Sequence, residues 1–208
     1  MVEQPSILLI EDEPRLRKNL QLLLQSEGYR ITTASDGAEG IQKVAEEPYD
    51  LVITDIMMPK LDGFGMVHRL RLNPETRDLP VIFLTATYVA LEDKTFALNI
   101  GATRFIEKPV NFERFLETID QLLTQGVHEA SAPMNEAEFY EGYRQRLEKK
   151  LNQKITQIAR DERLLSSLSE EEKPAFKVSL QLALNEQDEI QHLLDEIQIR
   201  MANTTKPE

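Results

Sequence analysis

The N-terminal three fifths of the chain alternate between short apolar runs and longer segments whose apolar residues recur at helical spacing. The apolar runs cover residues 7–10, 51–53 and 81–84, with strand-like runs at 29–34 and 104–106. Helical spacing follows each run, over residues 16–24, 38–45, 64–70, 91–100 and 112–123. Continuous apolar strands are typical of a parallel sheet covered on both faces, because neither face meets water. The pattern therefore predicts an α/β fold of five β/α units around one parallel sheet.

Residues 126–133 interrupt this pattern with Gly, Ser and Pro, which is typical of a linker. Asn135 suits the N-cap of a long helix that we expect to run to about residue 166, with Glu138 at its third position. Ser169 and Glu172 resemble the capping box of a second helix, although Pro174 leaves its first residue open. We predict a domain at residues 1–125, a linker at 126–134, a helical hairpin at 135–202 and a disordered tail at 203–208.

The second predicted helix carries apolar residues at alternating spacings of four and three, which is a heptad seam with one polar member, Gln187. A lone two-helix hairpin buries too little apolar surface to be stable, so we expect the seam to need a partner. A second copy of the chain is favoured, giving a coiled-coil-like four-helix bundle, over docking on the first domain or binding a different protein. The seam consists of Phe176, Leu180, Ala183, Gln187, Ile190, Leu194, Ile197 and Met201.

Composition narrows the possible functions. The 208 residues carry a formal net charge of −12 and include no Cys, which excludes a disulfide scaffold, a Cys-based zinc site and a thiol nucleophile. The acidic balance argues against direct binding to DNA or to an anionic membrane. No apolar run approaches the ~20 residues that a membrane span needs, and the N-terminus lacks the features of a signal peptide. We therefore expect a soluble cytoplasmic protein.

Charged and hydroxyl side chains follow the predicted strands where each strand ends. Glu11 and Asp12 follow the first strand, Asp55 the third, Thr85 the fourth and Lys108 the fifth. These side chains should converge, because the carboxyl ends of parallel strands meet at one edge of the sheet. Neighbouring carboxylates repel one another unless a cation joins them, and oxygen ligands without His or Cys select Mg²⁺ or Mn²⁺. Since a carboxylate can also act as a nucleophile, the pattern indicates a metal-assisted phosphoryl acceptor.

Residues 5–125 resemble the receiver domain of bacterial two-component response regulators. The resemblance implies a flavodoxin-like (βα)5 fold with strand order 2-1-3-4-5. It also implies a phosphorelay switch that takes its phosphoryl group from a sensor histidine kinase or a phosphotransfer protein, and not an enzyme with an external substrate. The matching motifs are Glu11-Asp12, Asp55 in Ile53-Thr54-Asp55-Ile56-Met57-Met58-Pro59, Asp62-Gly63, Thr85-Ala86, Gly101-Ala102 and Lys108-Pro109.

The resemblance assigns the chemistry of the site to individual residues. Asp55 is the expected phosphoacceptor, with self-phosphorylation from a donor and slow self-dephosphorylation as its only reactions. Asp12, Asp55 and the backbone carbonyl of Met57 are the expected ligands of Mg²⁺, and Glu11 is expected to help through water. The ammonium group of Lys108 is expected to pair with the phosphoryl oxygens.

The resemblance further implies how a phosphoryl group would be sensed. The hydroxyl of Thr85 and the amide of Ala86 are expected to bind it, and Phe105 occupies the aromatic switch position. Phosphorylation adds up to two negative charges, which bias an existing two-state equilibrium. The Lys108–Pro109 peptide is expected to be cis, a geometry found almost only before proline.

Histidines and the C-terminal half leave other functions open. His68 is expected at the surface, His128 in the linker, and His192 on the solvent side of the second hairpin helix. A dimeric phosphotransfer module that uses His192 is one alternative function. Another is that the hairpin is the signalling stalk of a longer output protein. A DNA-binding output would need a basic recognition helix, which the acidic C-terminal half does not supply.

Overall fold

The computed structural model describes residues 4–85, 91–125, 134–169 and 172–204. The chain divides into two compact units, Met1–Met134 and Asn135–Glu208. The first unit contains the sheet with its helices, and the second contains two long helices. Most of the predicted linker and residues 205–208 of the predicted tail lie outside the described residues.

The first unit is built on one parallel sheet in the order β2-β1-β3-β4-β5, which confirms the predicted topology. Every residue of β1 and β4 is buried, as expected for strands that helices cover on both sides. The register places Ile10 beside Thr54, so the chain leaves β1 next to the end of β3. The strands are β1 (Ser6–Ile10), β2 (Arg30–Ala34), β3 (Leu51–Asp55), β4 (Val81–Thr85) and β5 (Arg104–Glu107).

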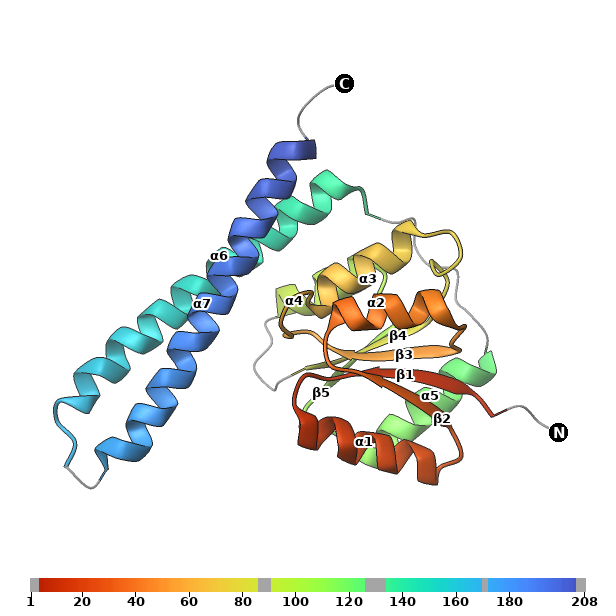
Figure 1. Cartoon of the computed structure of the whole chain (residues 1–208), viewed down its shortest axis with the longest axis horizontal. Helices are drawn as coiled ribbons and strands as arrows, with labels where there is room; N and C mark the ends of the chain where they lie inside the picture. Colours follow the sequence, from red (N-terminus) through yellow and green to blue (C-terminus); the bar gives the residue numbers. More distant parts are fainter. Residues whose placement is uncertain (1–3, 86–90, 126–133, 170–171, 205–208) are drawn as a thin grey trace. The chain divides into compact units, whose positions relative to one another are not determined.

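Helices cover both faces of the sheet, with α1 and α5 on one face and α2, α3 and α4 on the other (Figure 1). Apolar residues of α1 and α5 pack on the strands to form one buried cluster that includes Leu20, Leu24, Phe115 and Ile119. Burial of each such side chain contributes about 1.5–3 kcal/mol, so this layer holds the strand ends in place. The helices are α1 (Pro14–Ser26), α2 (Gly37–Glu46), α3 (Gly63–Leu72), α4 (Leu91–Asn99) and α5 (Phe112–Gln125).

Helices α1, α2 and α3 each begin at an acidic N-cap residue. The Glu13 carboxylate accepts hydrogen bonds from the amides of Arg15 and Leu16 at 3.0 and 2.9 Å. Asp36 caps α2 and Asp62 caps α3 in the same way. These caps satisfy amides that have no partner within the helix and place negative charge at its positive end. The loops between strand and helix are thereby fixed close to the site.

The second unit is a hairpin of α6 (Glu136–Leu165) and α7 (Lys173–Thr204), which lie side by side (Figure 1). The predicted N-cap is confirmed, because the Glu138 amide donates to the Asn135 side chain at 2.9 Å. In the predicted capping box, the Ser169 amide donates to the Glu172 carboxylate at 3.1 Å. Pro174 is the second residue of α7, where a missing amide hydrogen costs nothing.

Contacts within the hairpin use much of the predicted seam of α7. Four seam residues are only 3–4% exposed, and α7 packs along α6. An ion pair of 2.5 Å between Lys154 and Glu186 also joins the two helices. A partner outside the chain would therefore meet mainly the half-buried part of the seam. The buried members are Ala183, Ile190, Leu194 and Ile197, and the half-buried members are Phe176, Leu180, Gln187 and Met201.

Among the described residues, no helix combines the length and the apolar character that crossing a lipid bilayer requires.

Candidate functional site

Three carboxylates gather where β1 and β3 end. Glu11 and Asp12 directly follow β1, and Asp55 is the last residue of β3. Because these two strands are neighbours in the sheet, one ligand oxygen from each of the three lies within 4.8 Å of the other two. Glu11 is 1% exposed, Asp55 is partly buried and Asp12 is exposed, so the cluster opens to solvent on one side. The predicted convergence is found for these three residues.

Lys108 places a positive charge among the carboxylates. It follows β5, and its Nζ donates to Glu11 Oε2 at 2.8 Å and to Asp55 Oδ2 at 2.6 Å. The second oxygen of Asp55 accepts a hydrogen bond of 2.5 Å from the Ile56 amide. One ammonium thus bridges two of the three acids. The Lys108–Pro109 peptide is cis, which confirms the expected geometry.

Burial and mutual repulsion change the acidity of the cluster. Burial, opposed by the Lys108 hydrogen bond and reinforced by the charge of Asp55, raises the pKa of Glu11 to about 7. Burial and the charge of Asp55 also raise the pKa of Asp12. Burial opposes the charged form of Lys108, but the charges of Asp55 and Glu11 outweigh it and raise the pKa of the ammonium. The site therefore holds more negative charge than its lysine neutralises.

The donor set of this cluster fits a divalent cation. It offers carboxylate oxygens from Glu11, Asp12 and Asp55, one of them exposed, and no nitrogen or sulfur ligand among the three. Hard cations such as Mg²⁺ prefer such oxygens and keep some of their water, which the open side permits. A divalent charge would also relieve the repulsion by Asp55 that, together with the larger effect of burial, raises the pKa values of Glu11 and Asp12.

Other predicted site residues lie at the same strand ends. Thr85 is the last residue of β4 and is 3% exposed, and its carbonyl accepts a hydrogen bond of 2.6 Å from the Lys108 amide. Met57 lies in the loop between β3 and α3, and its side chain is exposed. Ala86, the expected amide donor, lies outside the described residues.

Phe105, at the expected switch position on β5, is half-buried and belongs to a row of aromatic rings. Its ring meets Phe83 edge to face at a centroid distance of 6.4 Å. Phe83 contacts Phe64 of α3 at 5.4 Å, and Phe64 contacts Phe96 of α4 at 5.3 Å. The Lys94 ammonium lies 5.7 Å from the Phe105 ring centre and pairs with Glu107. Side chains of α3 and α4 thus connect with the switch position.

The structure adds two residues that the sequence patterns did not single out, Asp36 and Lys60. Lys60 lies in the loop between β3 and α3 with a positive φ of 63°, and its Nζ pairs with Asp36 Oδ2 at 2.6 Å. Asp36-Gly37 and Pro59-Lys60 are typical turn sequences, which was the available signal. No short-range pattern could have paired residues from loops that are 24 positions apart.

The histidines differ in their surroundings. The expectation that His68 lies at the surface is wrong, because it is 3% exposed in α3 and its Nε2 lies 3.3 Å from the Met134 carbonyl oxygen. Helical spacing alone placed it beside the apolar stripe and could not reveal what covers that side of α3. His192 is exposed on α7, as expected, and His128 lies outside the described residues.

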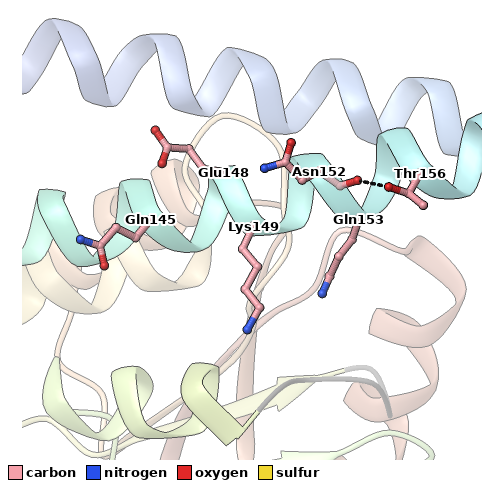
Figure 2. A pocket seen from close by; sticks show the side chains of 6 residues that line it. All are labelled: Gln145, Glu148, Lys149, Asn152, Gln153 and Thr156. Atoms are coloured by element: carbon pink, nitrogen blue, oxygen red, sulfur yellow. Dashed lines mark hydrogen bonds between the residues drawn. The ribbon is translucent and has the colours of Figure 1, made fainter.

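A pocket on the hairpin offers different chemistry. Figure 2 shows its lining along α6, where the Thr156 hydroxyl donates to the Asn152 carbonyl at 2.8 Å. None of these side chains is a histidine, and only one is a carboxylate, so the lining lacks the acceptor chemistry found at the strand ends. The lining residues are Gln145, Glu148, Lys149, Asn152, Gln153 and Thr156.

Comparison with known proteins places the first unit among receiver domains. The profile of the response regulator receiver domain matches residues 7–120. Chemotaxis protein CheY4 of Vibrio cholerae superposes with a TM-score of 0.55 at 30% identity, covering 58% of this chain and 100% of that one. A response regulator receiver domain protein from Clostridium thermocellum superposes with a TM-score of 0.54 at 31% identity, covering 58% and 95%.

Curated relatives share the receiver region but are longer. YkoG of Bacillus subtilis, an uncharacterized transcriptional regulatory protein, is 40% identical over 124 residues, which are 60% of this chain and 53% of that protein. The transcriptional regulatory protein AfsQ1 of Streptomyces coelicolor is 36% identical over 127 residues, which are 61% and 55%. The chain therefore spans about half the length of these relatives, and its hairpin lies outside the family match.

Proposed function

The chain belongs to the response regulator receiver domain family, and on this premise we propose that it is a phosphorylation-dependent response regulator in which Asp55 accepts a phosphoryl group with the help of Mg²⁺ or Mn²⁺. A receiver domain is a signalling phosphoacceptor module, and it implies a histidine kinase as partner. One observation carries the proposal: three carboxylates within 4.8 Å of one another, with a single lysine bridging two of them.

In the proposed reaction, a carboxylate oxygen of Asp55 bonds to phosphorus while the bond between phosphorus and the donor's histidine nitrogen breaks. Asp12, Asp55 and the Met57 carbonyl would hold the metal, with Glu11 acting through water. The metal would supply positive charge that offsets repulsion between the acceptor carboxylate and the incoming phosphoryl oxygens. Hydrolysis later transfers the phosphoryl group to water and restores the carboxylate.

Lys108 is the residue best placed to sense this reaction. Its ammonium already lies 2.6 Å from Asp55, so it would stay beside the acceptor and pair with the phosphoryl oxygens. Thr85 and the Ala86 amide would bind the same group, and Phe105 would follow the movement of Thr85. The protein would therefore act as a switch with no external substrate, through self-phosphorylation and slow self-dephosphorylation.

The output is proposed to be contact between proteins through residues 135–202, beyond a receiver at 1–125 and a linker at 126–134. As a constitutive joint between two chains, and not as the switched contact itself, a homodimer through the seam of α7 is favoured, because Phe176 and Leu180 are only half-buried in one chain. The acidic net charge of −12 speaks against direct DNA binding. Cytoplasmic location is part of the proposal, since a kinase partner of this type presents its phosphohistidine there.

Mg²⁺ affinity should depend on pH through Glu11. Its pKa is raised from 4.5 to about 7, so the carboxyl is mostly protonated at pH 6 and mostly ionised at pH 8. A cation favours the ionised form, so affinity should rise as the pH rises through the pKa, by ~10-fold between pH 6 and pH 8. Calorimetric titration of the full chain with Mg²⁺ at several pH values measures this.

A Glu11→Gln variant is the matched control for this titration. It keeps the shape of the side chain but cannot ionise, so its weaker Mg²⁺ affinity should vary much less with pH. An affinity of the unaltered chain that stays constant from pH 6 to pH 8 would contradict the role of Glu11.

Dimerisation is expected whether or not the acceptor is occupied. Light scattering of the full chain should give twice the 23.9 kDa chain mass, both alone and with Mg²⁺ and the phosphoryl mimic beryllofluoride. Replacing Phe176 and Leu180 together with Ser should give the mass of one chain. Val178→Ser with Leu182→Ser is the matched control, because both side chains lie outside the seam and are 72% and 59% exposed. A monomer in both states of the unaltered chain would refute the dimer.

A further inference from the structure

The loop between β3 and α3 is attached to the start of α2 at two places. The Gly37 amide donates to the Leu61 carbonyl at 2.9 Å, and Lys60 Nζ pairs with Asp36 Oδ2 at 2.6 Å. The approach is close, because a Cβ at Gly37 would lie 2.4 Å from the Leu61 oxygen. Neighbouring residues at the start of one helix thus fix neighbouring residues of the loop.

The two members of the ion pair differ in how firmly they are held. The Asp36 side chain is 3% exposed, caps α2 through the Glu39 amide and accepts a hydrogen bond from the Ser35 hydroxyl. The Lys60 side chain is 70% exposed, but its backbone adopts a φ of 63°, a conformation that few side chains favour. Asp36 is therefore a rigid anchor, and Lys60 is the part of the loop that it holds.

This loop also begins at the acceptor. It leaves β3 at Asp55, passes through Met57 and returns to Ile56, whose carbonyl accepts a hydrogen bond of 2.8 Å from the Gly63 amide. The Ile56–Gly63 contact closes the base of the loop, while the Asp36–Lys60 pair restrains its far side. Met57 lies between these two restraints.

We propose that the Asp36–Lys60 ion pair is a positioning device that holds residues 56–62 ready for a divalent cation at the acidic cluster. Neither residue belongs to the proposed ligand set, so the pair acts through the loop. The inference rests on the proposed function, because it needs the cation site at Asp55. A loop fixed before binding loses less conformational freedom when the cation arrives, which makes binding tighter.

Charge alone predicts a different result, and this makes the proposal testable. Through simple attraction or repulsion, loss of the Lys60 cation would strengthen Mg²⁺ binding and loss of the Asp36 anion would weaken it. If the pair positions the loop, both losses weaken binding, and the double variant is no worse than either single variant. The sign of the Lys60 effect therefore separates the two explanations.

Lys60→Asn and Asp36→Asn are the variants that remove the ion pair. Asparagine at position 60 tolerates a positive φ better than most residues and does not add the backbone freedom of glycine, and asparagine at position 36 keeps the N-cap of α2. Calorimetric titration of the full chain with Mg²⁺ alone should show binding weakened by about threefold to fivefold in each variant and in the double variant. Hydrogen exchange without metal should be faster in residues 56–62 of each variant, while the melting temperature changes little.

A Lys43→Gln variant is the matched control, because Lys43 pairs with Glu39 on α2 at 3.5 Å and touches no residue of the loop by a described ion pair or hydrogen bond. It should bind Mg²⁺ like the unaltered chain. Tighter binding by Lys60→Asn, or additive effects in the double variant, would overturn the positioning role. Failure of the unaltered chain to bind Mg²⁺ would instead overturn the proposed function.

Discussion

An Asp55→Asn variant is expected to take up no phosphoryl group, with labelling from a phosphohistidine donor or acetyl phosphate reduced more than ~100-fold. The amide has almost the same size as the carboxylate but is a poor nucleophile, and it removes one of the three negative charges that would hold the metal. Lys108 loses one of its two acidic partners, at 2.6 Å, and keeps Glu11 at 2.8 Å, so the fold around the site should persist. Radiolabel incorporation in the presence of Mg²⁺ measures the loss.

His192→Gln is the matched control for this experiment. The imidazole of His192 is exposed on α7 and is the alternative acceptor. Because Asp55 is the proposed acceptor, removal of the imidazole should leave labelling unchanged. The label should be released by hydroxylamine, which cleaves acyl phosphates. Labelling that survives Asp55→Asn and disappears with His192→Gln would move the acceptor to the hairpin and refute the proposed role of Asp55.

A Gly63→Ala variant is expected to lose ~3 kcal/mol of unfolding free energy, near the upper end of the usual cost of overpacking. The added Cβ would lie 2.3 Å from the Asp55 carbonyl oxygen and 2.8 Å from Phe83 Cε1. The first atom belongs to the backbone at the end of β3, and the second is part of a buried ring, so neither can move away from the added Cβ without a large cost in free energy. Urea unfolding without metal measures the loss, and weaker Mg²⁺ binding should accompany it because Asp55 must shift.

Gly65→Ala, two residues further along α3, is the matched control. Its added Cβ would meet mainly the end of the Leu61 side chain, with Cδ1 at 2.7 Å, and this side chain can rotate away. Alanine also favours helix over glycine by ~1 kcal/mol, so the two effects should nearly cancel. A loss below ~1 kcal/mol in Gly63→Ala would mean that the β3–α3 loop is softer than its contacts indicate.

The parallel sheet and most of the acidic cluster could be predicted because they depend on local patterns and on one rule of topology, whereas the strand order was predicted from the resemblance to receiver domains. Continuous apolar runs identified β1, β3 and β4, and parallel strands bring the residues that follow them to one edge. Glu11, Asp55 and Lys108 follow from that rule, although they are up to 97 positions apart. Helix caps such as Asn135 were visible for a similar reason, since capping needs only neighbouring residues.

Contacts between loops could not be predicted in this way. Asp36 and Lys60 lie on loops whose meeting depends on the final packing of α2 and α3, and neither residue breaks a pattern in the sequence. The burial of His68 likewise depends on which chain segment covers α3. The heptad seam of α7 could be predicted from the sequence. That α6 of the same chain covers part of this seam could not, because periodicity does not identify the partner of an apolar stripe.

The ion bridges around Lys108 leave the acidic cluster short of positive charge, so the folded chain is under electrostatic stress that the unfolded chain does not share. Any divalent ion that relieves this stress binds the folded state in preference and raises its thermal stability by mass action. With the proposed cation site at this cluster, we expect the melting temperature of the protein to rise with the concentration of divalent ions, and chelators to lower it.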